Sequence, residues 1–294
     1  MMKTSFLKGD LKRLAKDVVP DTAEYLYQNE NYYEDGEERH NFDVLVPKGS
    51  TGKLPCIINI HGGGFCACTK DIYDNYVRRM ASEGFVVINI NYSLAPKHPF
   101  PEGVEDCVAA INYCLARKEK YRMTDDYFVM GDSAGANLTA TMGLIATNPE
   151  YASLMNLKID EKMKGIYLSC GCYSFYDTDE QKYPLDLKPL YFQKKPKNYP
   201  DRKKYELYES LTSDFPPTFI TSCADDFMYH DNLRMEAELK KLGVQTVSCI
   251  YDETHNPLGH VFNYKHISDE GKLYPEAIEV REVSTKFFKE LIAK

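Results

Sequence analysis

A serine at the centre of a glycine-flanked turn is the residue of this chain best suited to chemistry. The segment Gly131-Asp-Ser-Ala-Gly135 follows a short aromatic and β-branched run and precedes a run of small residues. This sequence predicts a strand, a sharp turn and a helix, with the Ser133 hydroxyl standing clear of the sheet. Backbone N–H groups at the start of the helix would then face the site and favour negative charge there. The pattern indicates a nucleophilic serine.

A second glycine-rich segment, His61-Gly-Gly-Gly64, directly follows the apolar run 57–60. Three consecutive glycines leave the backbone free to turn its N–H groups toward an approaching atom. An oxyanion hole for acyl transfer needs such donors. A flexible turn is the alternative interpretation, and the histidine and the strand before the glycines argue against it.

Carboxylates and histidines that could complete such a site follow predicted strands nearer the C-terminus. Asp225 and Asp226 come after the run 218–222, and His255 and His260 come after the last predicted strand. A buried carboxylate can fix a histidine's tautomer and stabilise its charged form, while the histidine removes a proton from the serine. Neighbouring side chains in extended backbone point in opposite directions, so only one aspartate can serve. The other is expected to cap a helix or to be solvated.

Strands and helices alternate along the chain, which predicts an α/β fold with a doubly wound, mainly parallel sheet. Strands are expected at 41–47, 55–60, 85–91, 127–131, 165–170, 218–222 and 245–251, and helices at 71–84, 102–120, 134–147, 231–242 and 275–293. In such a sheet the ligand site lies at the carboxyl ends of the strands. The serine, the glycine run, the aspartates and the histidines all follow predicted strands.

Three segments together resemble the hormone-sensitive-lipase group of α/β-hydrolases, which includes many bacterial carboxylesterases. They are His61–Gly64, Gly131–Gly135 and Asn91–Asp106. The last contains Tyr-Ser-Leu-Ala-Pro-Lys-His-Pro-Phe-Pro, which is similar to the family's Tyr-x-Leu-Ala-Pro-x-x-Pro-Phe-Pro. The likeness runs from about residue 41 to the C-terminus, apart from the irregular stretch 171–216. It implies the α/β-hydrolase fold and ester hydrolysis without a metal or an organic cofactor.

The resemblance also implies roles for single backbone groups. Gly63, Gly64 and Ala134 would supply the N–H groups of the oxyanion hole. The segment Tyr92–Asp106 would be structural and would position the loop behind the site, so His98 within it is expected to be structural rather than catalytic.

For the acid and the base, the resemblance favours one residue of each candidate pair. The family has Asp-Pro-Leu-x-Asp after the corresponding strand, which places the acid on Asp226 rather than Asp225, with Phe227 in place of the proline. The family's histidine is followed shortly by phenylalanine, as His260 is here, although Val261 stands where glycine is more usual. The resulting chain order of serine, aspartate and histidine is that of α/β-hydrolases.

These residues predict an acyl-enzyme mechanism. His260, oriented by Asp226, would remove the proton of Ser133 as it attacks an ester carbonyl, and water would release the acyl group. Two other functions remain open. An arylformamidase or another amide hydrolase of this fold would use the same residues, whereas a non-catalytic member that binds a small ligand would be expected to lack one of them.

The expected organisation is a single α/β-hydrolase domain, 1–294, with cap elements from about 1–40 and 171–216. Residues 5–35 are expected to form one or two short helices over the body. Aromatic residues of the insert would either line an acyl pocket or pack the cap onto the body, and a compact cap favours short acyl groups; they are Tyr173, Phe175, Tyr176, Tyr183, Tyr191 and Phe192. Its basic residues would form a solvated face or attract an acidic substrate; they are Lys194, Lys195, Lys197, Arg202, Lys203 and Lys204.

Composition narrows the partners and the location. A net charge of −8 argues against nucleic acid and anionic membranes as partners, which leaves a small ester substrate. The nine cysteines lack the spacing of a disulfide framework or a zinc site, so reduced, buried thiols are expected. No apolar run has signal-peptide or membrane-span length, which predicts a cytoplasmic protein. The oligomeric state is open, with a homodimer as one arrangement.

Overall fold

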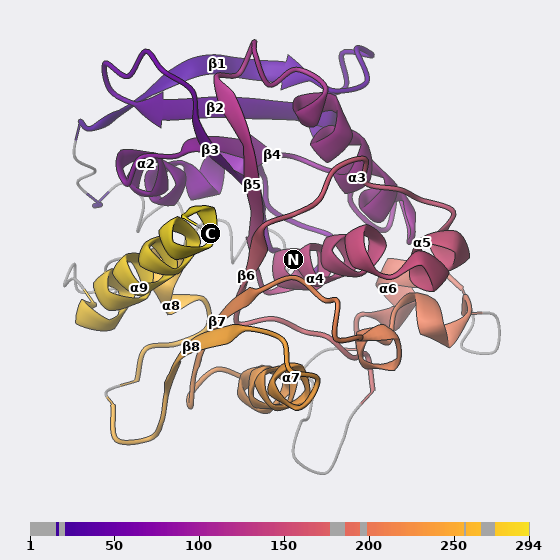
Figure 1. The fold of residues 1–294 in the computed structure, drawn as a ribbon. Helices are drawn as coiled ribbons and strands as arrows, with labels where there is room; N and C mark the ends of the chain where they lie inside the picture. Colours follow the sequence, from indigo (N-terminus) through magenta and orange to yellow (C-terminus); the bar gives the residue numbers. More distant parts are fainter. Residues whose placement is uncertain are drawn as a thin grey trace.

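The computed structural model describes residues 16–17, 21–176, 186–194, 199–255, 257–265 and 274–293. Within these residues eight strands form one sheet, in the order β1-β2-β4-β3-β5-β6-β7-β8 (Figure 1). The pairs β1–β2 and β2–β4 are antiparallel, and every later pair is parallel. The predicted α/β fold with a mainly parallel sheet is confirmed.

The inner strands are apolar on both faces because helices cover both sides of the sheet. All five residues of β4 and of β6 are buried. The strands are Ala23–Asn31 (β1), Asn41–Pro47 (β2), Leu54–Ile60 (β3), Val86–Ile90 (β4), Met123–Asp132 (β5), Gly165–Ser169 (β6), Thr218–Cys223 (β7) and Thr246–Tyr251 (β8).

The helices form a layer on each side of the sheet (Figure 1). Helices α2 and α9 pack on one face and α3, α4 and α7 on the other, and the apolar core is divided accordingly. The helices are Asp74–Ser82 (α2), Glu102–Leu115 (α3), Ala134–Thr147 (α4), Pro149–Met155 (α5), Lys188–Phe192 (α6), Tyr229–Lys241 (α7), Phe262–Lys265 (α8) and Pro275–Ile292 (α9). A short 3₁₀ helix, Lys70–Tyr73, precedes α2.

The N-terminal segment differs from the prediction. Residues 23–31 form the edge strand β1 and not a helix, so this part of the expected cap belongs to the sheet. An edge strand with a half-exposed face carries a weaker apolar signal than a central one, and the helical spacing before Pro20 obscured it. Most residues with that spacing, including Leu7, Leu11 and Leu14, lie outside the described part of the chain.

Helix α5 was also not predicted, although its N-terminus carries a recognisable signal. The side chain of Asn148 accepts hydrogen bonds from the backbone N–H groups of Glu150 and Tyr151, at 3.0 and 3.1 Å. Asparagine at the N-cap followed by proline at the first helical position is a typical helix start. The dipeptide Asn148-Pro149 is therefore the sequence signal for the start of α5.

A buried ion pair fixes the segment that leads into α2. The ammonium group of Lys70 lies 2.6 Å from the carboxylate of Asp43 on β2, and the two side chains are only 4% and 5% exposed. The carboxylate of Asp43 also accepts the backbone N–H of Asn29 at 2.8 Å. The segment held in this way includes Tyr73, which contacts the site described below.

Replacing one partner of this pair is expected to be costly, because the other charge stays buried. Asp43→Ala should lower the free energy of unfolding by about 3 kcal/mol. Glu119→Ala, which breaks the exposed pair with Lys53, is the matched control and should cost less than about 1 kcal/mol. Urea unfolding of both variants measures the difference, and equal losses would contradict the importance of burial.

Candidate active site

The turn between β5 and α4 holds Ser133 in a conformation that few residues adopt. Its backbone dihedrals are φ 52° and ψ −118°. A non-glycine residue with positive φ is strained and persists only where its surroundings hold it. The Ser133 N–H donates to the carbonyl of Ser169 at 2.8 Å, and its carbonyl accepts the N–H of Ala136 at 3.1 Å. These bonds fix the serine between strand and helix, where its side chain is half-buried.

The two glycines of the turn are required because the surrounding backbone leaves no room for a side chain. A Cβ at Gly131 would lie 2.4 Å from the carbonyl oxygen of Gly135. A Cβ at Gly135 would lie 2.1 Å from the carbonyl oxygen of Ile60 on β3. Both contacts are far below van der Waals distance, so no side chain fits at either position. The glycine spacing therefore follows from the close packing of strand, turn and helix.

Two hydrogen bonds connect Ser133 with a histidine and an aspartate from the ends of other strands. His260, beyond β8, places Nε2 at 3.0 Å from the hydroxyl oxygen of Ser133. Its Nδ1 lies 2.8 Å from a carboxylate oxygen of Asp226, which follows β7. The structure thus brings the three predicted residues together. His255 is not part of this group and contacts Asp252 at 3.4 Å.

The Asp226 carboxylate is buried and surrounded by donors. It accepts the N–H of Met228 at 2.8 Å and the hydroxyl of Ser222 at 3.3 Å, besides its bond to His260. Burial raises the pKa of Asp226, but the charge and hydrogen bond of His260, together with Cys170 and the Met228 N–H, outweigh it and leave that pKa below its usual value. An ionised carboxylate can stabilise an imidazolium ion.

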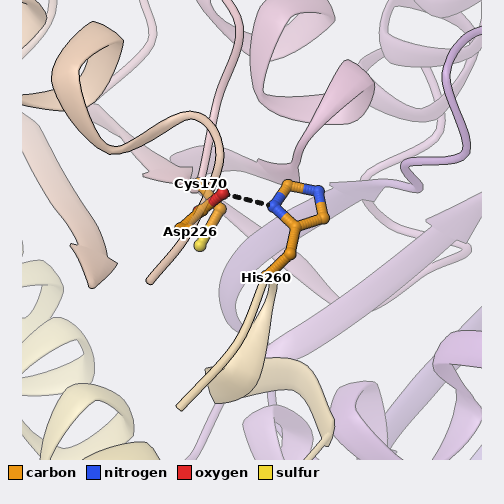
Figure 2. A group of neighbouring side chains, drawn as sticks. All are labelled: Cys170, Asp226 and His260. Atoms are coloured by element: carbon orange, nitrogen blue, oxygen red, sulfur yellow. Dashed lines mark hydrogen bonds and ion pairs between the residues drawn. The ribbon is translucent and has the colours of Figure 1, made fainter. Parts of the chain in front are cut away.

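Cys170 is a neighbour of this group that sequence reasoning assigned only to the buried thiols. The ligand-type atoms of Cys170, Asp226 and His260 lie within 4.8 Å of one another (Figure 2). In the described part of the chain no other cluster has three possible metal ligands. A metal would need the thiolate, yet burial raises the pKa of Cys170 well above its usual value. The chemistry of these donors fits a thiol packed against a carboxylate better than a metal site.

Asp225, the alternative acid, faces the backbone of the histidine loop and not the imidazole. Its carboxylate accepts the N–H groups of Leu258 and Gly259, at 3.1 and 2.7 Å. It caps no helix, since α7 begins after Met228. Of the two roles expected for Asp225, the helix cap is wrong, whereas its side chain is exposed to solvent as the other predicted.

His61 anchors the start of the glycine-rich loop. It is fully buried, and its ring stacks on Tyr92 with centroids 4.4 Å apart. The hydroxyl of Tyr92 donates to the carbonyl of His61 at 2.8 Å, which fixes the backbone before the glycines. Burial lowers the pKa of His61 to about 4. The ring is therefore neutral near pH 7 and acts as a structural element.

The next residues expose backbone donors. Gly63 and Gly64 have φ values of 112° and 59°, and a Cβ at Gly63 would lie 2.3 Å from the carbonyl oxygen of Ala67. Within the described residues, the N–H groups of Gly63, Gly64 and Ala134 donate no hydrogen bond. The oxyanion hole that these three donors would form stays a prediction.

A buried aspartate that sequence reasoning did not single out joins this loop to the serine turn. The carboxylate of Asp132 accepts the N–H of Gly62 and the hydroxyl of Tyr73, both at 2.9 Å. Asp132 is 2% exposed, and burial raises its pKa to about 6. Its place inside the serine motif was a signal for its importance, whereas nothing in the sequence indicated Tyr73.

This raised pKa predicts a pH dependence of stability. Between the ordinary value of 3.8 and about 6, folded Asp132 binds a proton that the unfolded chain has released, so its contribution to stability falls as pH rises through this range. Asp132→Asn removes that titration. The free energy of unfolding of Asp132→Asn, measured with urea, should rise relative to that of the wild type by on the order of 2 kcal/mol between about pH 4 and pH 7.

Tyr73→Phe is the matched control, because it keeps the carboxylate and removes one donor to it. In Tyr73→Phe the contribution of Asp132 to stability should still fall as pH rises, since loss of a donor to the charged form raises the pKa of this carboxyl further. Parallel stability curves for the wild type and Asp132→Asn would contradict the assignment.

The insert after β6 packs against the glycine-rich loop. Tyr191 of α6 stacks on Phe65 with ring centroids 4.0 Å apart, and Phe175 lies 5.8 Å from the same ring. Phe175, Tyr191 and Phe192 are all buried, which favours the packing role over an open acyl pocket. Tyr183, Lys195 and Lys197 lie outside the described residues. Arg202 is exposed and pairs with Glu209, as expected of a solvated face.

Comparison with known proteins places this arrangement in a family. The family described as alpha/beta hydrolase fold matches residues 57–258, more than half of the chain. The chain belongs to the alpha/beta hydrolase fold family. Hormone-sensitive lipase of Bos taurus is 38% identical to this α/β-hydrolase over 106 residues, or 35% of the chain and 14% of the lipase. The resemblance inferred from the sequence is confirmed.

Two further comparisons cover more of this α/β-hydrolase. Versiconal hemiacetal acetate esterase of Dothistroma septosporum is 25% identical over 227 residues, or 70% of the chain and 66% of that esterase. The crystal structure of esterase B from Lactobacillus rhamnosis superposes with a TM-score of 0.87 at 20% identity, covering 98% and 92% of the two chains. Several other curated relatives are matched over about a third of their length or less.

None of the helices in the described part of this α/β-hydrolase combines the length and the apolar character needed to cross a bilayer.

Proposed function

We propose that this α/β-hydrolase is a serine carboxylesterase that hydrolyses esters of short acyl groups, such as acetyl. The observation that carries the proposal is the continuous chain of hydrogen bonds from Asp226 through His260 to the hydroxyl of Ser133. This is the geometry of a nucleophile, a base and an orienting acid. Retention of all three groups argues against a non-catalytic, ligand-binding role.

The reaction would proceed in two halves. Nε2 of His260 takes the proton of Ser133 as its oxygen attacks the ester carbonyl carbon, and the N–H groups of Gly63, Gly64 and Ala134 bind the oxyanion. The intermediate collapses, and His260 gives its proton to the departing alcohol. Water then loses a proton to His260 as it attacks the acyl-enzyme, and the carboxylic acid leaves while the Ser133 hydroxyl is restored.

The preference for short acyl groups is supported by the space beside the oxyanion donors. A Cβ at Gly64 would lie 3.6 Å from the side chain of Leu187, just before α6, so the insert closely approaches the glycine-rich loop. Tyr191 and Phe192 of the insert are occupied in packing on Phe65 and Phe100. One relative, moreover, carries an acetate ester in its name.

The remaining parts of the proposal concern organisation and partners. We propose a single catalytic domain, 1–294, with residues 171–216 contributing a cap, and a small-molecule ester as its binding partner. A cytoplasmic location and a homodimer remain predictions.

A series of chromogenic esters from acetyl to dodecanoyl tests the proposal on purified protein. We expect the highest kcat/KM with acetyl or butyryl and a decline with longer chains. Rates that rise steadily with chain length would contradict the short-acyl preference. An N-formyl arylamine in the same series tests amide hydrolysis as the alternative, and faster cleavage of that compound would replace ester hydrolysis as the main activity.

A further inference from the structure

The loop that carries His260 has an unusual backbone on both sides of the histidine. Gly259 has a φ of 80° and Val261 a φ of 62°. Glycine adopts this region readily, but a β-branched residue there is strained. The side chain of Val261 is buried in the core on the α9 face of the sheet, so packing accompanies the strain. Something outside the loop must hold it in this shape.

The carboxylate of Asp225 bonds to the backbone of this loop. Its two carboxylate oxygens each receive one backbone N–H of the loop, from Leu258 at 3.1 Å and from Gly259 at 2.7 Å. Hydrogen bonds to a charged acceptor are stronger than those to a neutral one. Other bonds of the loop here go to carbonyl acceptors. The carbonyl of Gly259 accepts the N–H of Phe262 at 3.2 Å and the thiol of Cys223 at 3.5 Å, and the carbonyl of Val261 accepts the N–H of Tyr264 at 3.1 Å.

We propose that Asp225 is a positioning residue for His260, an inference that rests on the proposed function. The two adjacent carboxylates position His260 in different ways. Asp226 bonds to the imidazole, while Asp225 bonds to the backbone just before the histidine. His260 must meet Asp226 and Ser133 at the same time, at 2.8 and 3.0 Å. A displacement of about 1 Å at such a site can cost about a hundredfold in rate.

The strain at Val261 provides a test that separates positioning from general stability. Asp225→Ala should lower kcat about tenfold or more and change KM by less than about twofold, because it displaces the base and leaves the proposed oxyanion donors in place. The rate at which a fluorophosphonate labels Ser133 should fall by the same factor. Asp225→Asn keeps one acceptor oxygen and should lie between Asp225→Ala and the wild type.

The substitution Val261→Gly should reduce the loss of kcat that Asp225→Ala causes. Glycine adopts a φ of 62° without strain, so the loop needs less external support. In the Val261→Gly background, Asp225→Ala should therefore cost only about threefold or less in kcat. A residue that merely stabilised the fold would cost the same factor in both backgrounds.

Asp252→Ala is the matched control. Asp252 is also exposed and also accepts a backbone N–H, from Thr254 at 2.9 Å, but it lies in the turn directly after β8 and does not hold the backbone before His260. This variant should keep wild-type kcat. Asp225→Ala with wild-type kcat and labelling rate, or with equal losses in both backgrounds, would overturn the role of Asp225. If the wild type hydrolysed no ester, the proposed function would fail, and the labelling rates would still decide the role of Asp225.

Discussion

Ser133→Ala is expected to lower kcat for a chromogenic acetate ester by about 10⁴-fold or more. The variant has no oxygen at the position 3.0 Å from Nε2 of His260, so no acyl-enzyme can form. The N–H groups of Gly63, Gly64 and Ala134 remain, and KM or the inhibition constant of a substrate analogue should therefore change little. Initial rates, corrected for spontaneous hydrolysis, give the ratio.

Ser153→Ala is the control for this measurement, because Ser153 is an exposed serine on α5, outside the site. It should leave kcat unchanged. Turnover by pure Ser133→Ala above about one hundredth of the wild-type rate would contradict the assignment of the nucleophile.

Asp226→Asn is expected to lower kcat by about 10³- to 10⁴-fold with little loss of stability. The carboxylate accepts from Nδ1 of His260 and so leaves Nε2 free to take the serine proton. An amide can instead donate to Nδ1, which favours the tautomer with hydrogen on Nε2 and removes the base. Rates and thermal unfolding of the same preparation separate loss of the base from loss of the fold.

The adjacent carboxylate provides the comparison for Asp226→Asn. Asp225→Asn keeps the imidazole tautomer and should cost at most about tenfold in kcat. Losses of similar size for the two variants would contradict the division of roles between the two aspartates.

The sheet was predictable because most of its strands are buried on both faces and read as continuous apolar runs. Such a run at 55–60 corresponds to β3, and the one at 218–222 to β7. Strand β1 carries no such run, since it lies at the edge and pairs only with β2. Local pattern is therefore informative in the centre of this sheet and weak at its edge.

The candidate site was predictable to the extent that strand ends determine it. Ser133 and His260 follow β5 and β8, as the position of ligand sites in parallel sheets suggests. The choice between Asp225 and Asp226 could not be derived from alternation along a strand, because both lie in the turn beyond β7, where that rule does not apply.

Residues that act through long-range contacts could not be found in this way. Tyr73 meets Asp132 across 59 positions of the chain, and Asp225 meets Leu258 across 33. Neither contact leaves a local pattern. The cap is a similar case, because the aromatic residues of the insert find their partners on the glycine-rich loop and on Phe100 only when the chain is folded.

Covalent labelling of Ser133 tests the central claim most directly. An organophosphate with a chromogenic leaving group should release one equivalent of that group per protein and leave a single adduct, which peptide mass spectrometry should locate on Ser133. Ser133→Ala should release none, and Asp226→Asn should react at least about a hundredfold more slowly. A stoichiometric adduct on another residue, or no adduct on protein that hydrolyses esters, would contradict the account.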